Sequence, residues 1–459
     1  MSPLPDIGAD QLRLLEQARA FVRARSARGL DVAVDPECYL NPWAQDVGHS
    51  RLRTLFSGWR ARPSYLGERT KDTAAYWLRP CDFDVAASAD GYRRPFGTML
   101  VSWSRGSDFN ADGVYSDRYV RLSSADTPDV LWFLVSLDDV PPEKIAPNVR
   151  ICHKVQTTRA RGLLSSRSRA RAGRPASALN DSGARLPSHA RATALAIASA
   201  VQSELRSQRV RHLVMAYEAQ PFQHAANLVA KAHDPAIVTV GYQHSSLTAT
   251  PTDFVYRRGA PDRLFVHGSG QADILLRHLD WPAERLQVSE SLRYRRGDPA
   301  PLAKHILLPY SFDDADRIVV AIEEYLRSAA PRSLPRWSVR NHPVMTSSRK
   351  HLDLENRIRS LVSRYEDRTT EDPSADRQTM IIGATAAVIE ALERGLEVVH
   401  LCANPLLEAH TSAIWRELEV QTLAPSIYRY ELKKPGSYIR LGEASLPAGE
   451  RLGVLLADT

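Results

Sequence analysis

The sequence predicts an α/β protein made of two doubly wound domains that face a common cleft. Its 459 residues are more than one ordinary hydrophobic core holds, and 43% of them are hydrophobic, enough for two cores. From about residue 192 onwards, short apolar runs alternate with segments of helical periodicity, a pattern typical of parallel sheets with crossover helices. The Gly- and Pro-rich segment 297–301 separates two such series and is interpreted as a hinge between the domains.

We therefore expect a first domain over 1–298 and a second over 299–459. The first begins with an amphipathic helix over 9–28, whose apolar side chains recur at helical spacing. The stretch 38–95 is rich in Trp and Tyr, and we interpret it as helical core rather than as an acceptor-binding surface. Two apolar runs that follow, 98–103 and 130–136, are predicted strands.

The alternating region starts with a predicted helix over 192–208. Further strands are expected at 212–217, 236–242, 263–266, 286–288, 305–309, 337–341, 379–382 and 397–401. Helices are expected between them at 222–233, 269–278, 315–328, 352–365 and 386–394. Because open α/β sheets bind ligands at the carboxyl ends of their strands, the residues that follow these strands are the first candidates for a site.

The positive charge is concentrated in one segment. The chain carries 60 basic and 53 acidic residues, a net charge of +7, and the segment 157–191 alone contains eight arginines and a single acid, Asp181. Rich in Arg, Ser, Ala and Gly and without periodicity, this segment is predicted to be a long loop or disordered. It suits peripheral association with an anionic inner-membrane surface or a lipid-linked acceptor, and a solvated insertion is the alternative. It has no interleaved aromatic residues, so a nucleic-acid partner is not expected.

The cysteines and the N-terminus favour a cytoplasmic protein. Four cysteines are widely spaced and form no metal-ligand or redox motif, so we expect reduced thiols: Cys38, Cys81, Cys152 and Cys402. The first ten residues carry two acids, Asp6 and Asp10, and no apolar run typical of a signal peptide follows. No apolar run is long enough for a transmembrane helix.

His342 follows the strand predicted over 337–341 and precedes Pro343. A proline keeps the residue before it extended, so the imidazole is expected at the strand tip, free to donate to a phosphate oxygen. Tyr310 and Ser311, which follow the strand over 305–309, are assigned to the same nucleotide site. A histidine with only structural contacts in a loop is the alternative.

The segment 381–395 is predicted to be a strand, a turn of small residues and a helix that starts near Ala386. Free N–H groups at such a helix start can hold a phosphate, and Thr385 adds a hydroxyl. Glu390 lies early in the helix, where its carboxylate can accept hydrogen bonds from ribose hydroxyls. The alternative is a capped helix with an exposed glutamate. Neither G-x-G-x-x-G nor a Walker lysine is present, so dinucleotide and ATPase sites are not expected.

Glu218 and His244 follow two successive predicted strands of the first domain. Glu218 precedes a helix that opens with Pro221, and His244 follows Gly241-Tyr242-Gln243. Either side chain can act as a general base facing the cleft. The alternative for Glu218 is a carboxylate at a helix start that the macrodipole stabilises. The alternative for His244 is a residue of a structural turn.

With these four motifs in order, the chain resembles GT-B glycosyltransferases of bacterial surface-carbohydrate synthesis. The resemblance covers about 200–400 and includes enzymes with a His-Pro motif that use CMP-activated acidic sugars, the Kdo and sialyl transferases, and the related CDP-polyol phosphotransferases. It implies two Rossmann-like domains. In that family His342 corresponds to a histidine that contacts the nucleotide phosphate. Thr385 corresponds to one member of a hydroxyl pair, and the second hydroxyl is replaced here by Ala384 or Ala386.

The resemblance implies a metal-independent transferase that moves a sugar, with a CMP donor favoured, to a surface glycan or lipid-linked acceptor. No cofactor is expected beyond the nucleotide-sugar co-substrate. Glu218 or His244 would take the acceptor proton, and His342 with the helix near Thr385 would stabilise the leaving phosphate. Two alternatives stay open: a CDP-polyol phosphotransferase of the same fold, and a scaffold of glycan assembly without catalysis.

Overall fold

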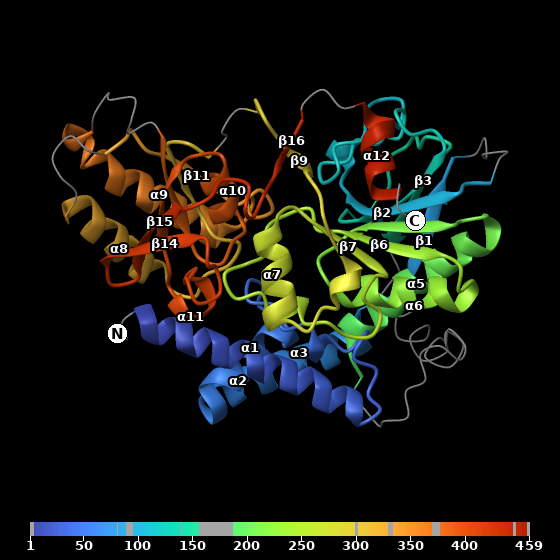
Figure 1. The fold of residues 1–459 in the computed structure, drawn as a ribbon, viewed down its shortest axis with the longest axis horizontal. Coiled ribbons are helices and arrows are strands. Elements are labelled where there is room, and N and C mark those ends of the chain that lie inside the picture. Colours follow the sequence, from blue (N-terminus) through green and yellow to red (C-terminus); the bar gives the residue numbers. More distant parts are fainter. Residues whose placement is uncertain are drawn as a thin grey trace.

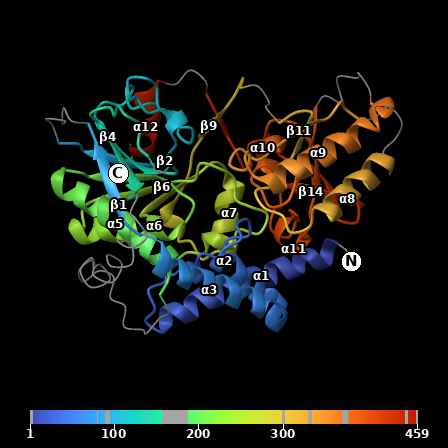
Figure 2. The same ribbon diagram turned by 180° about the vertical axis from the view of Figure 1, so that it is seen from behind.

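The computed structural model describes residues 4–79, 81–88, 95–138, 140–155, 187–298, 302–328, 334–369, 377–443 and 447–456. Two large β-sheets with flanking helices lie side by side, and the N-terminal helices run beneath both (Figures 1 and 2). The predicted α/β class is confirmed. Most of the Arg-rich segment 157–191 and residues 299–301 of the predicted hinge lie outside the described residues.

The first sheet has eight strands in the order β1-β4-β3-β2-β5-β6-β7-β8. All neighbouring strands are parallel except β1, which pairs antiparallel with β4 at the edge. The strands are β1 (Phe83–Ala87), β2 (Thr98–Ser104), β3 (Val130–Ser136), β4 (Val149–Lys154), β5 (His212–Ala216), β6 (Val238–Tyr242), β7 (Arg263–Val266) and β8 (Leu286–Val288). After β2, strands β3 and β4 are placed on one side of it, and β5 to β8 are placed on its other side. The strand order therefore reverses between β2 and β5.

Helices cover both faces of this sheet (Figure 1). Alternate residues of β2, β3 and β5 pack against α5 (His189–Ser207) and α6 (Pro221–His233), and the intervening residues pack on the other face. That second face is covered partly by α12 (Ala448–Leu456), through Leu452 and Leu455. The C-terminal helix therefore packs on the sheet built from the first half of the chain.

The second sheet has the order β11-β10-β12-β13-β15-β14. Its strands are β10 (His305–Leu307), β11 (Ser338–Arg340), β12 (Gln378–Ile382), β13 (Glu397–Leu401), β14 (Leu418–Ala424) and β15 (Ile427–Leu432). One face packs against α8 (Ala315–Ser328) and α9 (Arg349–Ser363), and α10 (Ala387–Glu393) lies on the other. Here the strand order reverses between β10 and β12, because β11 is added on one side and β13 on the other.

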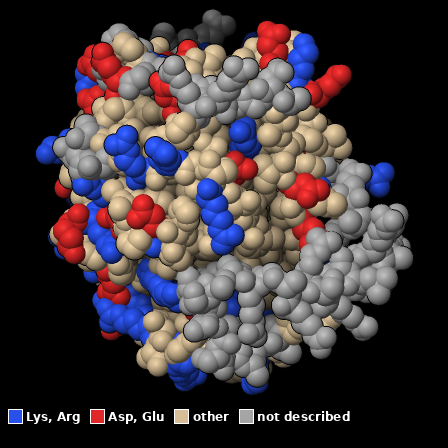
Figure 3. Space-filling model, turned by 90° about the vertical axis from the view of Figure 1, so that its right-hand side faces the viewer, with Lys and Arg blue, Asp and Glu red and all other residues tan. Residues whose placement is uncertain are grey.

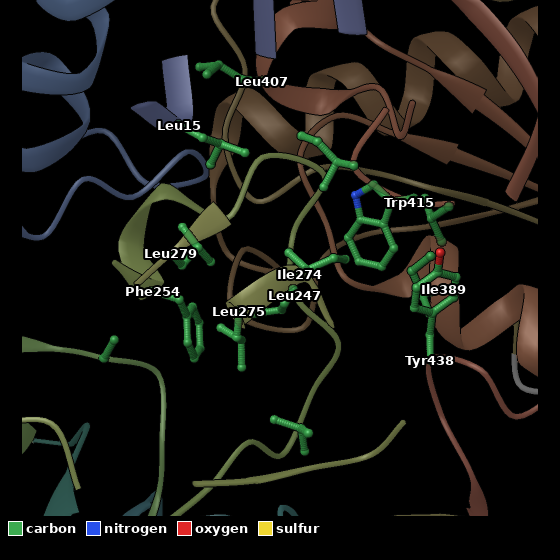
Figure 4. Close-up of a cluster of buried hydrophobic side chains, with 14 of the residues drawn as sticks. Leu15, Leu247, Phe254, Ile274, Leu275, Leu279, Ile389, Leu407, Trp415 and Tyr438 are labelled. Atoms are coloured by element: carbon green, nitrogen blue, oxygen red, sulfur yellow. The ribbon is translucent and has the colours of Figure 1, made fainter. Parts of the chain in front are cut away.

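A shared apolar core joins the two halves of the chain (Figure 4). It includes Leu15 of α1 (Leu4–Ala27), Leu275 of α7 (Ser269–His278), Ile389 of α10, and Trp415 and Tyr438 from the C-terminal region. A short two-stranded sheet of β9 (Ser291–Arg295) and β16 (Leu441–Gly442) adds a backbone link. Such a buried apolar interface restricts the relative motion of the two halves. The predicted boundary between 298 and 299 stays a prediction.

Two expectations were wrong. The sheets are mixed rather than parallel: β15 pairs antiparallel with both β13 and β14. Only two residues join β14 to β15, and Ser426 among them has φ +67°, so the connection is a hairpin and no crossover fits. The aromatic stretch 38–95 is also only partly core. Trp59 is exposed on the 3-10 turn between α2 (Val47–Ser57) and α3 (Arg62–Leu78), and Trp77 is exposed on α3.

Element ends differ from the sequence-based ones by a few residues, as at α1 and α5, which start earlier than predicted. Among the described residues, no helix is both long and apolar enough to cross a bilayer. Lys and Arg side chains lie among acidic and uncharged ones over the described surface of the face in Figure 3. No field of a single sign covers that part of the molecule.

Candidate functional site

A cavity of about 550 Å³ opens at the carboxyl edge of the second sheet, and we name it the C-terminal cavity. It lies where the strand order reverses between β10 and β12, which is the position of the binding crevice in open α/β sheets. Its walls include Pro309 and the segments 311–314, 382–384 and 403–408, which lie at or beyond the ends of β10, β12 and β13, whereas Tyr310 is not part of the wall. The loop before the second helix closes it through Trp43, and that helix, over 47–57, through His49 and Arg53. The volume suits a small-molecule ligand.

Gly383 shapes the floor of this cavity. Its φ is +77°, a conformation that side chains other than glycine rarely adopt. A Cβ at this position would lie 2.9 Å from the Cβ of Pro309, so the ends of β10 and β12 approach closely only because no side chain intervenes. Glycine is therefore required at position 383 for two reasons: the positive φ, and the close contact that any side chain would make with Pro309.

The predicted donor residues are divided between the cavity and its surroundings. Ser311 lines the cavity, and its hydroxyl donates to the Trp43 carbonyl at 2.9 Å. Thr385 accepts a hydrogen bond from the Ala387 N–H at 3.1 Å, and Ala386 is the residue before α10. Neither belongs to the cavity wall, which ends at Ala384 on this side. The helix that was predicted to hold a phosphate is only seven residues long.

His342 lies two residues beyond β11 and packs edge-on against Tyr310, with ring centroids 5.3 Å apart. Tyr310 packs in the same way on Trp43, so a row of three rings joins the second sheet to the N-terminal helices. Burial, with smaller effects of His351 and Arg105, lowers the pKa of His342 to about 4. The ring is therefore neutral at neutral pH. Because its Nδ1 accepts from the Val344 N–H, the proton lies on Nε2, which can donate to a phosphate oxygen.

Glu390 is paired rather than free. Its carboxylate binds the guanidinium of Arg394 at 3.3 Å, and it does not line the C-terminal cavity. It also acts electrostatically on Arg293, which belongs to β9 of the opposite half. Glu390 therefore lies at the boundary between the two halves of the chain. Its predicted role as an acceptor for ribose hydroxyls stays a prediction.

A second cavity, of about 650 Å³, opens at the carboxyl edge of the first sheet, and we name it the N-terminal cavity. It also lies at a reversal of strand order, since Trp103 at the end of β2 and the segment 220–222 after β5 both line it. One wall comes from α3 and another from α5. Gln45 lines both cavities, so the loop before α2 separates them.

Glu218 and His244 form a pair next to this cavity: neither lines it, but Gln220, which bonds Glu218, and Trp103, which packs on His244, both do. Glu218 Oε1 lies 3.2 Å from His244 Nε2, and Oε2 accepts from Gln220 at 2.7 Å. Burial tends to raise the pKa of Glu218, but the hydrogen bond and charge of His244 outweigh it, aided by Gln220 and Arg293, so the pKa lies below its usual value. The Glu218 side chain is 30% exposed and that of His244 is 4% exposed. Glu218 is therefore the member of the pair that a substrate can reach.

A tight turn presents Glu218. Ala219 has φ +55°, an unfavourable conformation for alanine. Its carbonyl accepts from the buried guanidinium of Arg257 at 2.5 Å, which holds the turn in place. Gln223 braces the same turn: it accepts from the Glu218 N–H at 2.9 Å and donates to the Ala216 carbonyl at 2.6 Å. Strain held by such contacts is common at functional sites.

Aromatic rings and a cation surround the pair. The His244 ring packs against Tyr119 at 4.4 Å and Trp103 at 6.0 Å, measured between ring centroids. The Arg293 guanidinium lies 6.0 Å from the centre of the Tyr119 ring and 3.5 Å from the His244 carbonyl. Burial lowers the pKa of Arg293, but Tyr294 and Glu390 outweigh it and the pKa is raised. This residue is a permanent cation between the two halves.

The sequence-based reasoning missed several of these residues. Arg293 and Trp43 lie outside the predicted strand-end motifs, and only the packing of distant segments brings them to the site. Arg105 directly follows β2, so its place after a predicted strand could have suggested it. Glu408 in the C-terminal cavity and Asp253 near Glu218 are acids whose pKa burial raises to about 7.

The comparisons with known proteins add no identity to this geometry. No family model matches the chain, and no curated protein matches it in sequence.

Proposed function

We propose that this protein transfers a sugar from a nucleotide donor to a hydroxyl of an acceptor, in a GT-B arrangement of two Rossmann-like domains. The observation that supports the proposal best is the pair of cavities, one at the strand-order reversal of each sheet, separated by the loop that contains Gln45. Two adjacent crevices of ligand size suit a reaction between two substrates. The donor would occupy the C-terminal cavity and the acceptor the N-terminal one.

Glu218 is the group suited to take the acceptor proton. It is ionised at neutral pH because its pKa is lowered, and it is exposed beside the N-terminal cavity. The acceptor oxygen forms a bond to the anomeric carbon while the bond from that carbon to the phosphate oxygen breaks. The phosphate leaves with the electron pair, and the acceptor proton goes to Glu218. His244 positions the carboxylate and stabilises its charge.

The groups available to the leaving phosphate come from both halves. Arg293 supplies a permanent positive charge close to the Glu218–His244 pair. His342 offers a neutral N–H donor. Arg105, which directly follows β2, acts electrostatically on His342 and adds a positive charge on this side. Stabilising the developing negative charge is the main contribution such groups make to the rate.

Nucleotide binding tests the donor half of the proposal. Thermal shifts and calorimetry with CMP, CDP, UDP and GDP should identify one nucleotide that stabilises the protein. Ala384→Phe should abolish this effect by filling the C-terminal cavity, whereas Ala190→Phe, on the wall of the N-terminal cavity, should leave nucleotide affinity unchanged. If the protein binds none of the four, or if Ala384→Phe binds as wild type does, the proposed donor site is wrong.

Turnover tests the base. With the nucleotide sugar that binds, Glu218→Gln should slow release of the nucleotide by about 10²–10⁴-fold and leave donor affinity unchanged. His244→Gln should cost less, because this residue acts through Glu218. The acidic limb of the pH–rate profile should disappear in Glu218→Gln. If Glu218→Gln keeps wild-type turnover, Glu218 is not the base.

A further inference from the structure

The helix α3 carries an exposed apolar stripe that the site does not use. Leu66 and Trp77 are 52% and 42% exposed, and they are eleven residues apart, about three helical turns, so they lie on one side of the helix. Trp59 is 80% exposed on the 3-10 turn that leads into α3. Single exposed apolar residues are common, but apolar side chains grouped on one face often mark a binding surface.

The charges around the stripe are of one sign. Arg60 and Arg62 are exposed beside Trp59 and, within the part of the chain that the structure describes, form no ion pair. The two acids of α3, Glu68 and Asp72, are paired with Lys71 at 2.6 Å and Arg69 at 3.1 Å. Both acids line the N-terminal cavity and so lie away from the stripe. The outer surface of α3 therefore combines tryptophan, leucine and arginine without an acid.

The opposite side of the same helix forms a wall of the N-terminal cavity. Ala75, for example, lines the cavity and follows Leu66 by nine residues, a spacing that places two side chains about 180° apart. Figure 2 shows α3 along the lower edge of the molecule, with the N-terminal helices. Whatever the stripe binds is thus one helix diameter from the proposed acceptor cavity.

We infer that this stripe, defined by Trp59, Leu66 and Trp77, docks the protein onto an anionic lipid bilayer. Apolar side chains flanked by arginine are the composition of helices that lie in a membrane interface, and tryptophan prefers that depth. A second copy of the chain fits less well, because the outer face of α3 offers no acid that could pair with Arg60 and Arg62 of the other copy. Docking would present the N-terminal cavity to a lipid-linked acceptor, a consequence that rests on the proposed function.

Vesicle co-sedimentation tests this inference. Wild-type protein should bind vesicles of phosphatidylcholine with phosphatidylglycerol more tightly than vesicles of phosphatidylcholine alone, and added salt should weaken that binding. Replacing Trp59, Leu66 and Trp77 together by glutamine should lower the partition coefficient at least about ten-fold, since each buried apolar side chain contributes about that factor or more. The matched control is Leu276→Gln with Val320→Gln, which changes exposed apolar residues of α7 and α8 and should bind as wild type.

A second readout reports the depth of insertion. Brominated lipids should quench the fluorescence of wild-type protein more than that of Trp59→Phe, because Trp59 would lie within the interface. Equal vesicle binding by wild type and the glutamine triple variant would overturn the inference, as would a wild-type dimer that this variant converts to monomers without any vesicle binding. Nucleotide-induced stabilisation of the triple variant should equal that of wild type. Vesicle binding therefore tests the membrane inference alone, and nucleotide binding tests the proposed function, which fails if wild type binds no nucleotide.

Discussion

Burial of Asp253 should make the stability of this protein fall as pH rises through neutrality. The side chain is 3% exposed, and its Oδ2 accepts a long hydrogen bond from Trp43 Nε1 at 3.4 Å. Within the described residues Oδ1 has no hydrogen-bond partner. Burial raises the pKa of Asp253 from 3.8 to about 7, against the opposing effects of Trp43 and Arg257. The folded state therefore favours the protonated carboxyl.

The sign and size follow from linkage. A group whose pKa is higher in the folded state stabilises folding at pH values below its unfolded pKa, and that contribution is lost as pH rises to the folded pKa. With values of 3.8 and about 7, the loss between about pH 5.5 and 8.5 amounts to roughly 2 kcal/mol. Asp253→Asn cannot ionise, so it should lack this part of the pH dependence.

Urea unfolding at several pH values measures the effect. The difference in unfolding free energy between Asp253→Asn and wild type should grow by about 2 kcal/mol in favour of the variant as pH rises from about 5.5 to 8.5. Taking the difference cancels the titration of other groups, such as Glu408, whose pKa is also raised to about 7. Parallel curves for the two proteins would show that Asp253 is ionised throughout, and the reasoning from burial would then be wrong.

Three further predictions concern the floor of the cavity, a buried carboxylate and the cation at the site. Gly383→Ala should destabilise the protein by about 1–3 kcal/mol in urea unfolding, from its positive φ and its close contact, whereas Gly453→Ala in α12, with open space, should not. Glu393→Ala should cost about 3 kcal/mol or more, because it leaves three N–H groups of the loop between β15 and β16 unpaired, and Glu393→Gln should cost less. Arg293→Met should raise the pKa of Glu218, moving the acidic limb of the pH–rate profile to higher pH; an unmoved limb would remove Arg293 from the electrostatics of the base.

Local patterns in the sequence predicted much of the fold. Apolar runs and helical periodicity depend on neighbouring residues, so the alternation of strands and helices from 192 to 401 could be predicted. The meeting of Glu218 and His244 could be predicted as well. Both follow successive strands, and β5 and β6 are parallel neighbours, so their carboxyl ends lie at one edge of the sheet.

Tertiary structure decided what depends on contacts between distant segments. The hairpin of β14 and β15, the core shared by α1 and the C-terminal region, and the exposure of Trp59 all result from packing partners that no local pattern reveals. Arg293 shows the reason most clearly. It lies on a short strand paired with residues near the end of the chain, and only that crossing places its charge beside His244. Periodicity tells which face of an element is buried, but not which distant element covers it.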